Sequence, residues 1–150
     1  MKHIFIITAA IALATFQAVA ESLPGWSTNF VATLEAARTG SKPVIVDFTA
    51  SWCGPCKMMA ASTLVDANVR KELQAFATVS IDIDEQQPIA QKFGVNAIPT
   101  FILLTPDGDE VTRQTGFQDA KAFTAWLNQG SVGVEPGDRK STRLNSSHIH

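Results

Sequence analysis

The sequence has few of the residues on which metal sites and disulfide-stapled scaffolds depend. Only two cysteines occur in the 150 residues, and the three histidines, His3, His148 and His150, lie near the chain ends. A structural zinc site needs four ligands, usually two cysteine pairs or one pair with histidines, so we expect no zinc site within the chain. A small secreted domain that relied on disulfides for stability would also carry more cysteines.

Charge is scarce as well. Charged residues make up 17% of the chain and the net charge is −2, which argues against a disordered chain and against a basic face for nucleic acid. Between residues 21 and 130, eight lysines and arginines stand against twelve aspartates and glutamates, a net charge of −4. We therefore expect no anionic partner.

The first twenty residues differ from the rest of the chain. Lys2 precedes an uncharged apolar run over residues 4–16, and Ala18-Val19-Ala20 places small residues just before Glu21. This pattern is typical of a cleaved secretory signal, so we predict a signal peptide over residues 1–20 and a periplasmic location. An uncleaved membrane anchor is the alternative, although the apolar run is at the short end for a membrane span.

The last twenty residues have no repeating apolar face. Gly, Ser, Asn and Arg dominate residues 131–150, which we predict to be a tail outside the fold, disordered or non-native. The two terminal histidines do not change this interpretation. The predicted domain is residues 21–130.

Between these ends, helical and strand patterns alternate. Helical spacing marks residues 28–38, and Gly40 is expected to stop that helix. A further helix should begin near Pro55, break around 62–66 and resume near 67–75. A turn is expected at 106–108, where Pro and Gly favour one. The other predicted elements are strands at 43–49, 78–84, 100–105 and 110–116, and helices at 87–93 and 119–129, the last with Asp119 as its cap.

This order predicts an α/β fold with one mixed sheet and helices on both of its faces. The strands at 43–49, 78–84 and 100–105 should be central. The chain has no internal repeats.

Both cysteines lie in the stretch Trp52-Cys53-Gly54-Pro55-Cys56, at the end of a predicted strand and the start of a predicted helix. Unpaired N–H groups and the helix dipole favour a thiolate on the first cysteine, and a thiolate is the attacking species in disulfide exchange. Cys53 is thus predicted to attack and Cys56 to resolve the mixed disulfide. Gly54 and Pro55 set the turn, and Trp52 offers a flat apolar contact.

Other uses of the pair remain open at this point. A copper(I) site on the two thiolates, or a metal shared between two chains, is compatible with the composition. An inert structural disulfide across two residues would constrain little chain and so add little stability.

The stretches VDFTASWCGPCK (46–57) and GVNAIPTF (94–101) resemble the thioredoxin family, and the element order is similar as well. The resemblance covers about residues 28–129 and implies the thioredoxin fold. Residues 62–73 are more similar to exported members, in particular to the C-terminal periplasmic domain of membrane thiol:disulfide interchange reductases.

The resemblance assigns roles by position. Pro99, followed by Thr100, matches a cis proline that lies against the active-site sulfurs and leaves the backbone of Ile98 free to pair with an extended substrate. Asp47 matches a buried acid with a raised pKa that takes the proton of the resolving thiol. Gly116 matches a glycine where a side chain would block partners, although a plain strand-ending glycine is the alternative.

One position departs from the family. A lysine often lies beside the buried acid, and here that position is Ser80. Lys57 follows the motif as in the family, or is simply a solvated helix residue.

Taken together, the resemblance implies a monomeric, exported thiol–disulfide oxidoreductase that reduces protein disulfides, with electrons from a membrane thiol–disulfide reductase. No nucleotide-binding motif is visible, and no cofactor is expected. A disulfide donor with the same fold, or a non-enzymatic binding or copper-carrying module, is the alternative.

Overall fold

Helices and strands alternate along the part of the chain that the computed structural model describes, residues 23–132 and residue 134. The order follows the sequence-based prediction, with bounds that differ by a few residues. The elements are α1 (Phe30–Gly40), β1 (Val44–Thr49), α2 (Gly54–Met58), η1 (Met59–Thr63), α3 (Ala67–Leu73), β2 (Ala77–Asp82), α4 (Gln87–Lys92), β3 (Thr100–Leu104), β4 (Glu110–Thr115) and α5 (Ala120–Val132).

The four strands form one mixed sheet in the order β2-β1-β3-β4. β1 runs parallel to β2 and antiparallel to β3, and β4 returns antiparallel to β3. The mixed sheet is as predicted, but the central place expected for the 78–84 strand is wrong, because β2 lies at the edge. Among residues 23–132, its outer side is paired by an isolated bridge between Ser27 and Val79.

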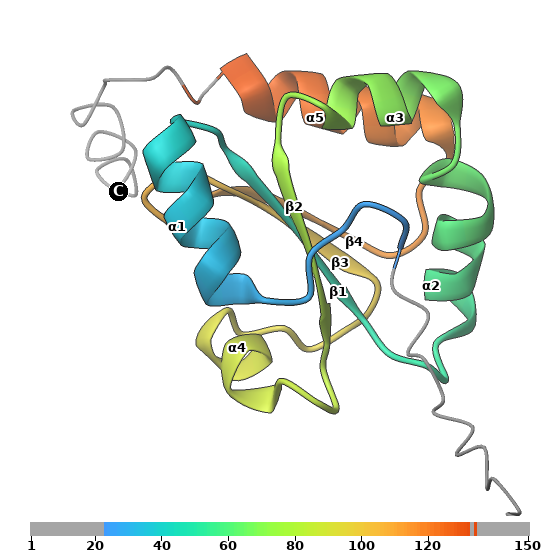
Figure 1. The fold of residues 1–150 in the computed structure, drawn as a ribbon. Coiled ribbons are helices and arrows are strands. Elements are labelled where there is room, and N and C mark those ends of the chain that lie inside the picture. The colour runs from blue at the N-terminus through green and yellow to red at the C-terminus, as the bar shows by residue number, and fades with distance from the viewer. Residues whose placement is uncertain (1–22, 133, 135–150) are drawn as a thin grey trace, which may run out of the picture.

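Helices cover both faces of the sheet, as Figure 1 shows. One core lies between the sheet and α1 and α4, and it contains Phe30, Val46 and Phe48. The other lies under η1, α3 and α5, and it contains Ile45, Met59 and Phe123. Neighbouring residues of β1 thus belong to opposite cores, as the alternation of side chains along a strand requires.

The helix after the cysteine pair changes its winding. α2 continues into η1, a π-helical segment closed by the N–H of Leu64, which donates to the carbonyl of Met59 at 2.9 Å. Asp66 then caps α3 by accepting from the N–H groups of Asn68 and Val69. The predicted break between two helical parts is confirmed, whereas the π-helical turn left no signal in the sequence.

The last helix begins as predicted, since Asp119 Oδ1 accepts from Ala122 N at 2.8 Å. It ends later, because α5 runs through Val132 and Val134 packs against the core under α3 and α5. The predicted start of the tail at Ser131 is therefore too early. Residues 135–150 and the predicted signal, residues 1–20, lie outside the described residues. Among the helices of residues 23–132, none is both long and apolar enough to cross a membrane.

The first helix also ends differently from the prediction. Gly40 is its last residue, and Ser41 takes the left-handed conformation with φ of 51°. The N–H of Lys42 bonds to the carbonyl of Ala37 and that of Ser41 to the carbonyl of Arg38, which is a Schellman motif. The motif favours glycine at the left-handed position, but this chain has Ser41 there and its glycine, Gly40, at the preceding position.

We therefore expect Ser41→Gly to raise the free energy of unfolding by about 0.5–1 kcal/mol, because glycine adopts this φ without the steric cost that a Cβ brings. Urea unfolding measures the change. Ser41→Ala is the matched control, since alanine keeps the cost and should give no gain. An equal change in the two variants would contradict the explanation.

Candidate active site

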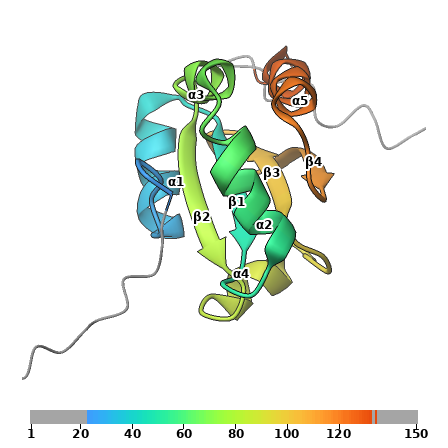
Figure 2. The same ribbon diagram turned by 90° about the vertical axis from the view of Figure 1, so that its right-hand side faces the viewer.

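The two cysteines lie just beyond the C-terminal end of β1 and are joined by a disulfide, with 5.3 Å between their Cα atoms. Cys53 is bonded back to the strand end by its N–H, which donates to Ala50 O at 3.1 Å, and it precedes the first residue of α2. Pro55 lies in the first turn of α2, where its missing N–H costs nothing. Figure 2 shows α2 lying in front of β1.

The two sulfur atoms are not equivalent. Cys53 Sγ accepts the backbone N–H of Cys56 at 3.2 Å. A hydrogen bond to this sulfur at the start of a helix favours its thiolate, which supports Cys53 as the attacking residue. Both residues are buried in the disulfide form, with exposures of 3% and 6%, so a partner must contact the residues around them to reach a sulfur. The part of the chain with described side chains contains no group of three or more His, Cys, Asp or Glu arranged to hold a metal.

The loop before β3 closes one side of the disulfide. The Ile98–Pro99 peptide bond is cis, as predicted, and Ile98 packs against the cluster of Ala50, Cys53 and Cys56. Neither backbone polar group of Ile98 makes a hydrogen bond to any described residue. These groups are therefore available to an extended partner, which is the role that the resemblance implied for this position.

Thr100 and Gly116 hold this loop in place. Thr100 Oγ1 donates to Ala97 O at 2.7 Å and lies 3.0 Å from Thr115 Oγ1, and Gly116 N donates to Pro99 O at 2.8 Å. Gly116 has φ of 88°, which favours glycine, and nothing lies within 4 Å of the position a Cβ would take. The left-handed conformation alone accounts for a glycine here, and whether a side chain would block partners stays a prediction.

The loop after Gly116 is attached to η1 by two contacts that the sequence did not indicate. Gln118 N donates to Met59 Sδ at 3.2 Å, and Thr63 Oγ1 donates to Gln118 O at 2.5 Å. They attach the loop that contains the exposed Phe117 to η1. No pattern in the sequence marks these pairs, because each joins residues more than fifty positions apart.

Trp52 lies beside the disulfide with 65% of its surface exposed. Its indole N–H donates to Asp84 Oδ2 at 2.8 Å, which fixes the orientation of the ring. Asp84 was predicted to lie within a strand, but β2 ends at Asp82 and Asp84 lies in the following loop. The ring is thus an exposed apolar surface of fixed orientation, and its role as a contact for partners stays a prediction. Sequence reasoning missed Asp84, which sets this orientation.

Asp47 lies within β1, where it is paired in register with Ser80 of β2 and Phe101 of β3. It shares a strand face with Ile45, whose core includes Met59, so its carboxyl lies on the side covered by α2 and η1. Burial raises the pKa of Asp47 from 3.8 to about 7, while the hydrogen bond from Ser80 acts in the opposite direction. A carboxyl with this pKa exchanges its proton near neutral pH, as an acid–base group must.

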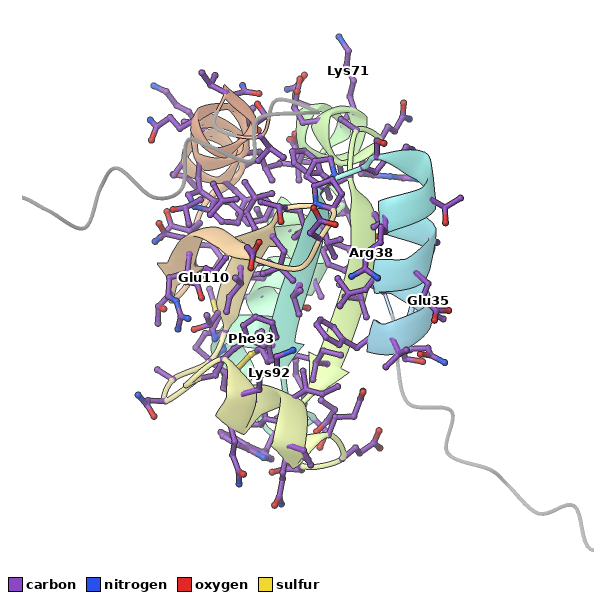
Figure 3. All side chains as sticks on the ribbon, turned by 90° about the vertical axis from the view of Figure 1, so that its left-hand side faces the viewer. Glu35, Arg38, Lys71, Lys92, Phe93 and Glu110 are labelled. Atoms are coloured by element: carbon purple, nitrogen blue, oxygen red, sulfur yellow. A yellow bond between two sulfur atoms is a disulfide. The ribbon has the colours of Figure 1, made fainter. Side chains whose placement is uncertain are left out.

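A groove of about 450 Å³ lies elsewhere, between α1 and α4. Figure 3 shows this face, with Lys92 and Phe93 side by side. Lys92 Nζ lies 5.6 Å from the ring centroid of Phe93. The groove is mostly apolar and contains no residue near the disulfide; it is lined by Phe30, Val31, Leu34, Glu35, Arg38, Pro88, Ile89 and Lys92.

The structure therefore brings the site residues predicted from the sequence to one end of the sheet. They come from the end of β1, the start of α2, the loop before β3 and the end of β4. A buried Cys53–Cys56 disulfide with exposed residues around it, and a buried carboxyl on the strand that leads to it, is the arrangement expected of a thiol–disulfide oxidoreductase. The residues placed in or beside this site are Asp47, Trp52, Cys53, Gly54, Pro55, Cys56, Ile98, Pro99, Thr100 and Gly116.

Comparison with known proteins agrees. The thioredoxin family model matches residues 25–129, and the chain belongs to the thioredoxin family. It is 39% identical over 95 residues to a thioredoxin of Bacillus subtilis, covering 63% of this chain and 88% of that one. It is 41% identical over 88 residues to a thioredoxin of Rickettsia typhi, covering 58% and 80%. A solved thioredoxin of Thermus thermophilus superposes with a TM-score of 0.67 at 27% identity, covering 83% and 99%.

The raised pKa of Asp47 predicts a pH-dependent stability. In the unfolded chain Asp47 ionises near its ordinary pKa of 3.8, and in the folded protein near 7. Between these two pH values the folded state binds more protons than the unfolded state, so the free energy of unfolding falls as pH rises. The fall is complete above about pH 7. Asp47→Asn stays neutral, and we expect it to raise the unfolding free energy of the oxidised protein by roughly 2–4 kcal/mol at pH 8.

Urea unfolding at pH 4 and pH 8 measures this effect, and the difference between the variant and the parent should be much smaller at pH 4, which lies just above the unfolded-state pKa, than at pH 8. Asp109→Asn is the matched control, because Asp109 is exposed on the turn before β4. An Asp47→Asn gain of equal size at both pH values would show that ionisation is not its cause.

Proposed function

We propose that the chain is an exported protein-disulfide reductase in the periplasm, in which Cys53 attacks and Cys56 resolves. The observation that carries the assignment of these roles is the hydrogen bond from Cys56 N to Cys53 Sγ, which favours a thiolate on Cys53. Family membership and the cysteine pair establish the oxidoreductase activity. Its direction, its location and the roles of individual residues are our proposal.

The reaction begins with the reduced pair. The Cys53 thiolate attacks one sulfur of a substrate disulfide, a bond forms between Cys53 Sγ and that sulfur, and the other substrate sulfur leaves as a thiolate. Ile98 supports this step, because its free backbone groups allow the substrate to pair as an extended segment beside the disulfide.

The second step releases the substrate. Asp47 accepts the thiol proton of Cys56, and the resulting thiolate attacks Cys53 Sγ. The second substrate sulfur leaves as a thiolate and takes a proton, so the substrate gains two electrons and the Cys53–Cys56 disulfide is restored. A dithiol donor must then reduce that disulfide, and we propose a membrane thiol–disulfide reductase for this part.

Exposed apolar side chains near the cysteine pair in sequence and in the loop after β4 support a protein substrate. Trp52 and Met58 flank the cysteine pair along the chain, Phe117 follows β4, and all three are exposed. A surface of this kind suits partners that bury apolar area on contact. The proposed location rests on the signal-like pattern of residues 1–20, and the reducing direction on the Gly-Pro sequence between the cysteines.

We expect Cys56→Ser to accumulate a stable mixed disulfide with a protein substrate such as insulin, because attack proceeds and resolution is lost. Cys53→Ser should lower disulfide reduction by at least about 1,000-fold and trap nothing. Non-reducing electrophoresis with mass spectrometry of the linked peptide measures both results. The double variant is the control for non-specific linkage, and a mixed disulfide through Cys56 in the Cys53→Ser variant would reverse the assigned roles.

The reduction potential decides the direction. We expect a value near about −270 mV for the Cys53–Cys56 pair, as in reducing thioredoxins, when the protein is equilibrated against dithiothreitol buffers. A value near about −120 mV would instead make the protein a disulfide donor. The Cys53→Ser/Cys56→Ser variant shows whether any other group contributes to the signal.

A further inference from the structure

We propose that Ser80 is a positioning residue for the resolving step: its hydroxyl donates to the Asp47 carboxyl, orients it beneath the cysteine helix and favours its ionised form. This inference rests on the base role proposed for Asp47. It assigns to Ser80 the task of keeping that base available at neutral pH.

The geometry places the two side chains together. Asp47 and Ser80 are direct partners in the parallel pairing of β1 with β2, and Ser80 Oγ donates to Asp47 Oδ2 at 3.3 Å. Ser80 is buried, as is Asp47. The neighbouring residues Val79 and Ile81 belong to the core under α1 and α4, so Ser80 lies on the opposite face with Asp47.

A second set of contacts holds Ser80 itself. Its N–H donates to Ser27 O at 2.8 Å, and Ser27 N donates to Thr78 O at 3.0 Å. These two bonds form the isolated bridge beside β2 and restrain the edge strand at the position of Ser80. The backbone of β2 at Ser80 is therefore paired with β1 on one side and with the bridge segment on the other.

The surroundings leave few other influences on the carboxyl. Ser80 is its only hydrogen-bond donor among the residues whose side chains are described. On the side of β3 the neighbour is Phe101, and Met59 of η1 lies in the core above. The titratable groups on the covering helix are the two cysteines and the exposed Lys57, and Asp82 lies two residues beyond Ser80 on the same strand face, where it accepts from Asp84 N.

The hydrogen bond has a direct consequence for the second step. A hydroxyl that donates to a carboxylate stabilises its charged form, and an unpaired carboxyl at the same place holds its proton to higher pH. Because burial already brings the pKa of Asp47 to about 7, loss of this bond would leave little ionised base at neutral pH. The attack by Cys53 does not use this base and should be unaffected.

The test uses the reduced full chain and a chromogenic aromatic disulfide in stopped flow. The first released thiolate reports the attack by Cys53, and the second reports resolution by Cys56. We expect Ser80→Ala to raise the pKa of Asp47 by about one. Titration of the Asp47 carboxyl carbon by NMR measures this change. At pH 7 the second phase should slow about fivefold, because about a tenth of the Asp47 carboxyl is ionised in the variant and about half in the parent. At pH 9 the carboxyl is ionised in both proteins, so their second phases should have equal rates.

Ser80→Thr is the matched control, because it keeps a hydroxyl on the strand and should restore both the pKa and the second phase. In the Asp47→Asn background, Ser80→Ala should have no further effect. A purely structural role of Ser80 would lower thermal stability without a pH-dependent change in the second phase.

The outcomes separate the two levels of the proposal. If Asp47→Asn slows the second phase but Ser80→Ala leaves both that phase and the pKa of Asp47 unchanged, the inference about Ser80 is overturned and the base role of Asp47 stands. If Asp47→Asn leaves the second phase unchanged at pH 7, the base role is overturned, and the inference about Ser80 with it.

Discussion

The structure depends on the burial of one short strand, of which every residue but the last is buried. β1 lies between β2 and β3, and it is covered on one face by α1 and α4 and on the other by α2, η1, α3 and α5. This strand contains Asp47 and leads directly to Cys53. Because its position is determined from all sides, the first residues beyond its end are placed with little freedom, and the disulfide lies there.

The same burial makes the site costly for stability. A carboxyl inside a strand with apolar neighbours above and below loses its hydration, and one hydrogen bond from Ser80 recovers only part of that loss. A serine here is smaller than the lysine often found in the family and carries no charge that could favour the carboxylate. Desolvation therefore raises the pKa of this carboxyl, and the hydrogen bond from the Ser80 hydroxyl lowers it in part.

Local patterns in the sequence were sufficient for the parts of the fold that are local. The β-branched run at 43–49, the Pro55 helix start and the Asp119 cap each depend on residues close in sequence, and the structure contains a strand, a helix start and a cap at these places. The edge position of β2 and the contact of Trp52 with Asp84 depend on distant pairs, for which one sequence carries no signal. The site could be predicted all the same, because the two stretches that resemble the thioredoxin family, 46–57 and 94–101, are distant in sequence and both contribute residues to it.

The π-helical turn behind the cysteines has a place in this arrangement. Met59 and Thr63, at its two ends, contact the same residue, Gln118: Met59 Sδ accepts from its N–H, and Thr63 Oγ1 donates to its carbonyl. Met58 and Phe117, both exposed, are next to these contacts in the chain. The loop after Gly116 is thus attached to η1 by directional hydrogen bonds as well as by apolar packing, so its position is determined before a partner arrives.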